Sequence, residues 1–103
     1  MTANVAKCLL VAKVLLADGM ITDEEREFLD DLMRKLGLTD AEQKRVGALE
    51  GVADAEGVAR ALPEADKQAL LDLLVDAAAV DGRLARRELS IVQRLAAALG
   101  VER

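Results

Sequence analysis

Two short stretches carry acidic residues whose spacing suggests metal chemistry. The chain reads ADGMITDEEREFL near its start and VDGRLARRELSIV near its end, so each stretch places a Glu seven positions after an Asp-Gly pair. Laid on the calcium loop of an EF-hand, Asp18 and Asp81 take the fifth position. Glu25 and Glu88 take the twelfth. The first and third positions, which supply further oxygens, are apolar in both copies, so neither stretch alone is a calcium loop.

A metal site shared by the two stretches is one hypothesis. Calcium prefers six to eight oxygen ligands, so such a site would combine backbone carbonyls with Asp18, Glu25, Asp81 and Glu88. Held about 5 Å apart, these carboxylates repel by about 3 kcal/mol per pair at an effective dielectric near 20, and a divalent cation such as calcium would offset that repulsion. Spread over the surface, the same groups need no cofactor.

A purely structural interpretation explains most of these residues, and we rank it first. Thr22 followed by Glu25 is the capping box that begins a helix, and the glycines are typical of helix ends. Glu88 has no such explanation, because Ala85 stands where the capping residue would be. An acidic site that binds a partner is the third alternative.

The composition argues against an enzyme. The chain has 103 residues with no His, no Tyr, one Cys and one Ser, so the commonest general base is missing. Cys8 lies in an apolar run and reads as a small buried hydrophobe, since no His is available to activate it. A lone cysteine also fits a reducing cytoplasm. The apolar run is interrupted by Lys13 and is shorter than the roughly 20 residues of a membrane span, so no membrane insertion is expected.

The two stretches carry opposite charges at matched positions, within a net charge of −5. Residues 18–31 hold seven acids, whereas residues 83–94 hold one acid and four arginines: Arg83, Arg86, Arg87 and Arg94. Solvated helix exteriors explain this best. The alternatives are salt bridges between the two helices, or docking of the basic end onto a protein partner, including a second copy in a homodimer. Nucleic acid binding is not expected of an acidic chain whose one aromatic residue is Phe28.

Composition and periodicity predict an all-α fold. Apolar residues make up 52% of the chain and are mostly Ala, Leu and Val, of which Ala and Leu favour helices. The length allows one domain, residues 1–103. Five to six helices are expected in it, at about 3–17, 22–36, 39–49, 63–80 and 86–99, with a short one between Gly57 and Pro63.

A shift of 63 residues aligns the two ends of the chain. The matched positions are Asp18 with Asp81, Gly19 with Gly82, Glu25 with Glu88, Leu32 with Leu95, Leu36 with Leu99 and Gly37 with Gly100. This pattern is typical of an internal duplication, with units at about 9–38 and 72–101. It predicts two helical hairpins packed about an approximate twofold axis.

The strings LLADGMITDEEREFLDDLMRKLGL and LLVDAAAVDGRLARRELSIVQRLAAALGV carry a family resemblance. Through them the chain resembles the tellurite-resistance TerB-like family, which also includes N-terminal domains of certain membrane-anchored DnaJ-like co-chaperones. The resemblance covers most of the chain except residues 45–62. It implies an all-helical fold, bacterial stress systems associated with tellurite, phage and chemical damage, and acidic candidate metal sites, with no established catalytic activity. We therefore expect a protein-interaction module that binds another protein; a divalent-metal sensor or buffer is the alternative.

Overall fold

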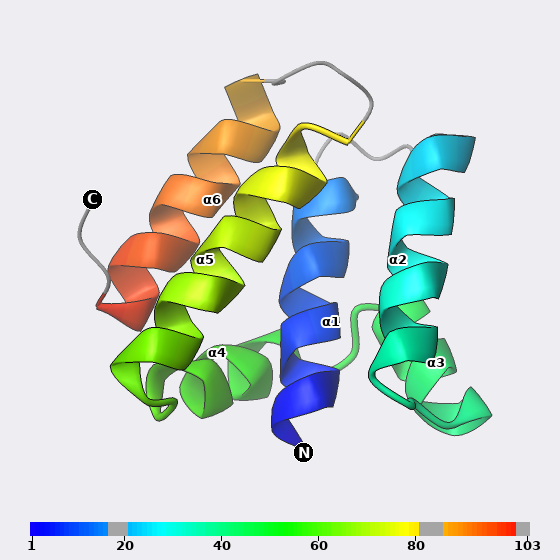
Figure 1. The fold of residues 1–103 in the computed structure, drawn as a ribbon, viewed down its shortest axis with the longest axis horizontal. Helices are drawn as coiled ribbons and strands as arrows, with labels where there is room; N and C mark the ends of the chain where they lie inside the picture. The colour runs from blue at the N-terminus through cyan, green and yellow to red at the C-terminus, as the bar shows by residue number, and fades with distance from the viewer. Residues whose placement is uncertain (17–20, 81–85, 101–103) are drawn as a thin grey trace.

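The computed structural model describes residues 1–16, 21–80 and 86–100, without the side chains of residues 86–88. The helices in these ranges are α1 (Ala3–Leu15), α2 (Asp23–Lys35), α3 (Asp40–Gly47), α4 (Val52–Arg60), α5 (Glu64–Ala78) and α6 (Arg86–Leu99) (Figure 1). Within the described ranges there is no strand. The predicted all-α fold of about six helices is confirmed.

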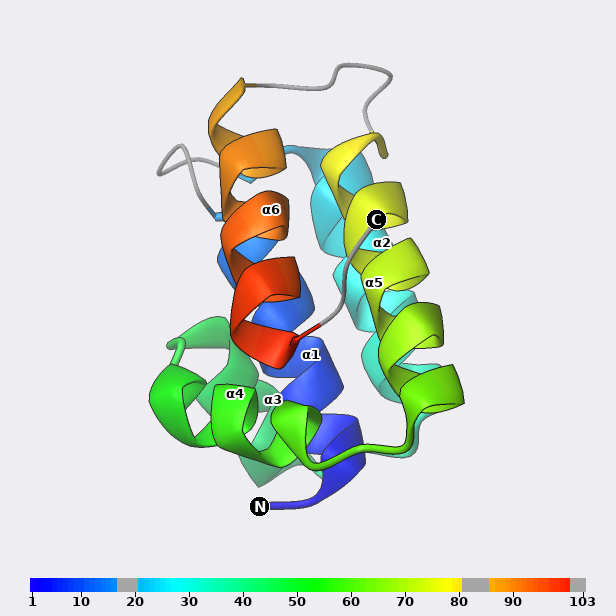
Figure 2. The same ribbon diagram turned by 90° about the vertical axis from the view of Figure 1, so that its left-hand side faces the viewer.

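Helix α1 runs through the middle of the molecule and contacts all five other helices. α5 and α6 pack together on one side of it, α2 lies on the other side, and α3 and α4 cover the end where the chain begins (Figures 1 and 2). A helix so enclosed has to be apolar on every face. Its buried residues are Val5, Ala6, Cys8, Leu9, Leu10, Val11, Ala12, Val14 and Leu15. The apolar run predicted as a core helix is therefore the centre of the core.

One polar contact caps α1, and another joins it to a neighbouring helix. The hydroxyl of Thr2 accepts a hydrogen bond from the backbone N–H of Val5 at 3.2 Å and caps the first turn. Near the other end, the Nζ of Lys13 lies 3.1 Å from the Oε1 of Glu56 in α4. Lys13 thus keeps its charge near the surface while its stem packs in the core.

A capping box begins each of the helices α2 and α3, as the sequence predicts. Thr22 and Glu25 form a reciprocal capping box, with N···O distances of 3.1 and 3.0 Å. Thr39 and Glu42 repeat it at the start of α3, at 3.2 and 2.8 Å. Between them Gly37 adopts a φ of +72°, a conformation that costs other L-residues about 1–2 kcal/mol. Both predicted capping boxes are confirmed, and α2 and α3 follow each other closely.

The predicted position of the fourth helix is wrong. A short helix was expected between Gly57 and Pro63, but α4 spans Val52–Arg60 and contains Gly57. Gly51 precedes it with a φ of +87° and ends the previous turn. Ala55 and Ala59 are fully buried, and α4 packs closely on α1. This packing offsets the cost of roughly 1 kcal/mol that a helical glycine carries.

The two hairpins share an end of the molecule. The C-terminal ends of α1 and α5 and the N-terminal ends of α2 and α6 all lie at the end opposite α3 and α4 (Figure 1). α2 and α6 begin 63 positions apart, and Gly37 and Gly100 have similar φ values of +72° and +74°. These features agree with an internal duplication, which itself stays a prediction. The turns around Gly19 and Gly82 lie outside the described residues.

The hypothesis of salt bridges between the acidic and basic helices is wrong for the described side chains. α2 and α6 lie on opposite outer sides of the molecule, with α1 and α5 between them (Figure 1). Asp31, the residue matched with Arg94, instead pairs with Arg34 of its own helix at 3.4 Å. The acidic helix α2 and the basic helix α6 therefore lie on different sides of the molecule.

Candidate functional site

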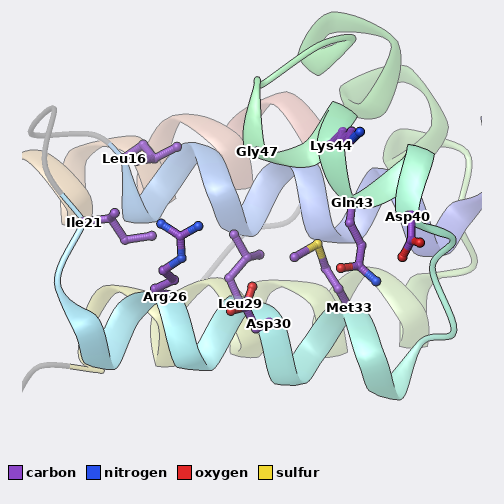
Figure 3. A pocket seen from close by; sticks show the side chains of 10 residues that line it. All are labelled: Leu16, Ile21, Arg26, Leu29, Asp30, Met33, Asp40, Gln43, Lys44 and Gly47. Atoms are coloured by element: carbon purple, nitrogen blue, oxygen red, sulfur yellow. The ribbon is translucent and has the colours of Figure 1, made fainter.

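A cavity of about 540 Å³ lies between α2 and α3, beside the C-terminal end of α1 (Figure 3). One wall is a single face of α2, formed by Arg26, Leu29, Asp30 and Met33. These positions follow the i, i+3, i+4, i+7 spacing of residues that share a helix face. We call this cavity the α2–α3 groove.

The opposite wall repeats the same spacing on α3. It consists of Asp40, Gln43, Lys44 and Gly47. α3 packs mainly on α1 rather than on α2, so the two faces look toward each other across open space instead of closing on each other. Two helix faces are thus presented to whatever enters the groove.

The base of the groove is apolar. Leu29 and Met33 are buried at its centre, and Leu16 and Ile21 are half-buried at the end nearest the α1–α2 connection (Figure 3). Methionine is flexible and polarisable, and it is common at binding surfaces that adapt to a partner. The base therefore offers an apolar contact that can adjust its shape.

The rim of the groove is charged. Arg26 and Asp30 on α2 are exposed, as are Lys44 and Asp40 on α3. Among the side chains that the structure describes, none pairs with these four charges. Along the groove in Figure 3, Arg26 precedes Asp30 on one wall and Lys44 precedes Asp40 on the other, in the same direction. On each wall, therefore, a basic residue is followed by an acidic residue.

The structure describes only part of the acidic set predicted as a metal site. Glu25 is 3% exposed and is the one buried charged side chain in the described ranges. Asp18 and Asp81 lie outside the described residues, and so does the side chain of Glu88. The side chains that are described form no cluster of three potential metal ligands. The four-carboxylate site stays a prediction.

The structure also describes only part of the arginine set that the sequence predicts as a partner-binding surface. Arg94 is exposed on α6, and Arg86 and Arg87 stand at the start of that helix. Arg83 lies outside the described residues. The use of this set for partner binding also stays a prediction.

Cys8 has the surroundings of a core residue. Its side chain is fully buried in α1. Burial raises the pKa of its thiol from 9.0 to about 11, because the thiolate is poorly solvated there, while the charge of Lys7 acts in the opposite direction. The interpretation of Cys8 as a buried hydrophobe is confirmed.

Comparison with protein families decides the relationship of the chain. A family model described as Tellurite resistance protein TerB matches residues 4–103. The chain belongs to the TerB family. The match also spans residues 45–62, which the sequence resemblance does not cover. Searches of curated proteins and of solved structures find no match.

Membership of the TerB family connects the chain with tellurite resistance, and the family is not generally known as one of enzymes. Within the described ranges, no helix has the length and apolar character needed to cross a membrane. None of the charged groove residues stands among the sequence-predicted site residues. The repeated spacing at 26, 29, 30, 33 and at 40, 43, 44, 47 is the signal in the sequence that marks them.

Proposed function

We propose that this TerB-family domain is a non-enzymatic protein-interaction module of a bacterial stress response, acting in the cytoplasm and binding its partner in the α2–α3 groove. The groove supports this proposal because it combines an apolar base with a rim of unpaired charges. Protein interfaces combine the same two features, an apolar centre and a polar rim. Its volume of about 540 Å³ is large enough to accept several side chains of a partner.

A site-specific cross-linking experiment tests this function. A photoreactive amino acid replaces Gln43 in the groove, in cells of the source organism challenged with tellurite. The matched control replaces Gln68, a half-buried glutamine of α5 outside the groove. We expect a discrete adduct from position 43 that disappears when Met33→Glu is added. Equal adduct patterns from both positions would show that the groove is not the docking surface.

Divalent-metal binding is the second candidate function. It is supported by the burial of Glu25 and by the four helix ends that share one end of the molecule. Asp18, Glu25, Asp81 and Glu88 are the proposed ligands, with backbone carbonyls and water completing a calcium shell. In this role the domain acts as a sensor or buffer of the cation.

Calorimetric titration with calcium, magnesium and manganese tests the metal function. Asp81→Asn removes one proposed ligand charge, and Asp54→Asn removes one exposed carboxylate at the other end of the molecule as the control. Metal binding predicts heat with the wild type and with Asp54→Asn, and its loss with Asp81→Asn. Equal, negligible heats in all three proteins would eliminate the metal hypothesis.

The basic end of α6 is a second surface that we propose for a protein partner, through Arg83, Arg86, Arg87 and Arg94. Its position on the outer side of the molecule, away from the acidic α2, supports this role. The double variant Arg86→Glu, Arg87→Glu tests it by affinity capture. The proposal predicts the loss of at least one partner, and an unchanged set of partners would contradict it.

A further inference from the structure

We propose that the α2–α3 groove takes a short amphipathic helix of a partner protein. Each flank of this helix carries an acidic residue and, one turn later, a basic residue, and the pair that faces α3 is displaced along the helix from the pair that faces α2. The inference rests on the proposed interaction function and specifies the chemistry of the partner. It is drawn from the spacing of the groove residues and from the order of their charges.

The shape of the groove suits a helix. Its two walls are faces of antiparallel helices, each defined by residues that span seven positions. At 1.5 Å per residue such a wall is about 10 Å long, which matches two turns of a docked helix. Amphipathic helices bind in grooves of this kind through side chains at i, i+3, i+4 and i+7.

The apolar stripe of the partner helix would pack on the apolar base of the groove. Ile21 and Leu16 are half-buried at one end of the groove, and Leu29 and Met33 lie at its base. Side chains such as Leu on the partner helix would cover the exposed parts of the first two residues and pack against the last two. This contact supplies affinity without a direction, because all four of these residues are apolar.

The charges on the rim of the groove set the direction in which the partner helix binds. On α2 the order along the groove is Arg26 and then Asp30, and on α3 it is Lys44 and then Asp40 (Figure 3). Residues four apart are about 6 Å apart along a helix. Lys44 and Asp40 stand farther along the groove than Arg26 and Asp30 (Figure 3). A partner helix therefore meets an opposite charge at all four rim positions when each flank carries a Glu and, one turn later, a Lys, with the pair that faces α3 displaced along the helix from the pair that faces α2.

Other occupants fit the rim less well. A ligand of one charge sign, including the phosphate backbone of a nucleic acid, would meet two repulsive groups, Asp30 and Asp40. A second copy of this chain could offer α6, where Leu89 is an exposed apolar residue. That helix carries Arg86, Arg87 and Arg94 against one acid in its sequence, so it lacks the acidic turn.

The test uses a fluorescent synthetic peptide of about 15 residues, long enough to populate a helix. It carries Leu in the apolar stripe and, on each flank, a Glu followed one turn later by a Lys, with the pair facing α3 displaced along the helix from the pair facing α2. Fluorescence anisotropy measures its Kd for the full-length domain. We expect saturable binding by the wild type, and its absence would overturn the proposal.

Wall-reversal variants make the test specific for charge order. The first variant reverses the α2 wall with Arg26→Asp and Asp30→Arg. The second also reverses the α3 wall with Asp40→Arg and Lys44→Asp. Reversing one wall makes the walls disagree, so binding should weaken about tenfold as two attractions become repulsions. Reversing both should restore most of the affinity, since the peptide can turn around. Equal Kd values for the wild type and the one-wall variant would overturn the proposal.

Two controls keep the outcomes distinct. Asp40 lies in the first turn of α3, where an arginine is unfavourable, so a version with Asp40→Asn replaces it if circular dichroism shows partial unfolding of the reversed protein. Ultracentrifugation of the wild type shows whether a second copy occupies the groove; a dimer that the peptide does not dissociate would overturn the proposal. Cross-links from position 43 without peptide binding would leave the interaction function standing and remove only the helical partner.

Discussion

Glu25 shows how one residue can serve both the fold and a candidate site. Its Oε1 accepts the backbone N–H of Thr22 at 3.0 Å, which satisfies a free donor at the start of α2. Its side chain is 3% exposed, although glutamate is seldom so fully buried. The capping box accounts for its place in the sequence, and a second role as a metal ligand is the proposal made above.

Substitution of Glu25 separates these roles. Glu25→Gln keeps an oxygen that can accept from Thr22 and should change the free energy of unfolding by less than about 0.5 kcal/mol. Glu25→Ala removes the acceptor and should cost about 1–2 kcal/mol, more than Glu42→Ala in the less buried second capping box. Chemical denaturation measures all three.

Two outcomes distinguish the roles of Glu25. Loss of metal binding in Glu25→Gln with unchanged stability would assign the carboxylate to a ligand role. Equal costs for the two alanine variants would show that the burial of Glu25 adds nothing to the stability that its capping box provides.

Cys8 should be unreactive in the folded protein. With a thiol pKa of about 11, its thiolate is scarce at pH 8, and the side chain is fully buried. Labelling with a thiol reagent should therefore proceed only through unfolding and speed up sharply in denaturant. Rapid labelling under native conditions would contradict the burial.

The raised pKa also predicts the pH dependence of stability. The unfolded thiol loses its proton near pH 9.0, but the folded one keeps it up to about pH 11. The contribution of Cys8 to stability is thus complete below pH 9 and declines as pH rises toward 11. The free energy of unfolding of the wild type should fall more steeply across this range than that of Cys8→Ala. Parallel curves would contradict this assignment.

At the scale of the elements, local signals predict helix starts well and tertiary packing less well. Thr22 with Glu25 and Thr39 with Glu42 are sequence patterns that act within one turn, and the structure confirms both. α4 could not be predicted in the same way, because Gly57 reads as a break. Only the burial of residues 55 and 59 against α1 shows why the helix continues through it.

Two glycines should respond to alanine in opposite directions. Gly57 lies inside α4, and a Cβ there meets no atom within 4 Å, so Gly57→Ala should stabilise the fold by about 0.5–1 kcal/mol. Gly37 also has space for a Cβ, but its φ of +72° disfavours one, so Gly37→Ala should destabilise by about 1–2 kcal/mol. Thermal unfolding measures both. A destabilised Gly57→Ala variant would show that α4 depends on a feature other than helix propensity.

At the scale of the whole molecule, the arrangement of the helices decides which surfaces exist. The charge difference between the two ends of the chain is visible in the sequence, yet only the fold shows that α2 and α6 lie on opposite outer sides. The α2–α3 groove likewise depends on α3 packing on α1 instead of α2. Sequence spacing identifies the residues of a helix face, but the packing of helices determines whether that face is buried or open.

The central claim, that this TerB-family domain binds a partner in the α2–α3 groove, is tested most directly by backbone amide chemical shifts. The ¹⁵N-labelled domain is titrated with the unlabelled partner captured by the cross-link at position 43. The account predicts that the largest shifts fall in residues 26–33 and 40–47, with Ile21 beside them, and that α5 stays unchanged. Shifts confined to α5 and α6, with the groove residues unaffected, would contradict it.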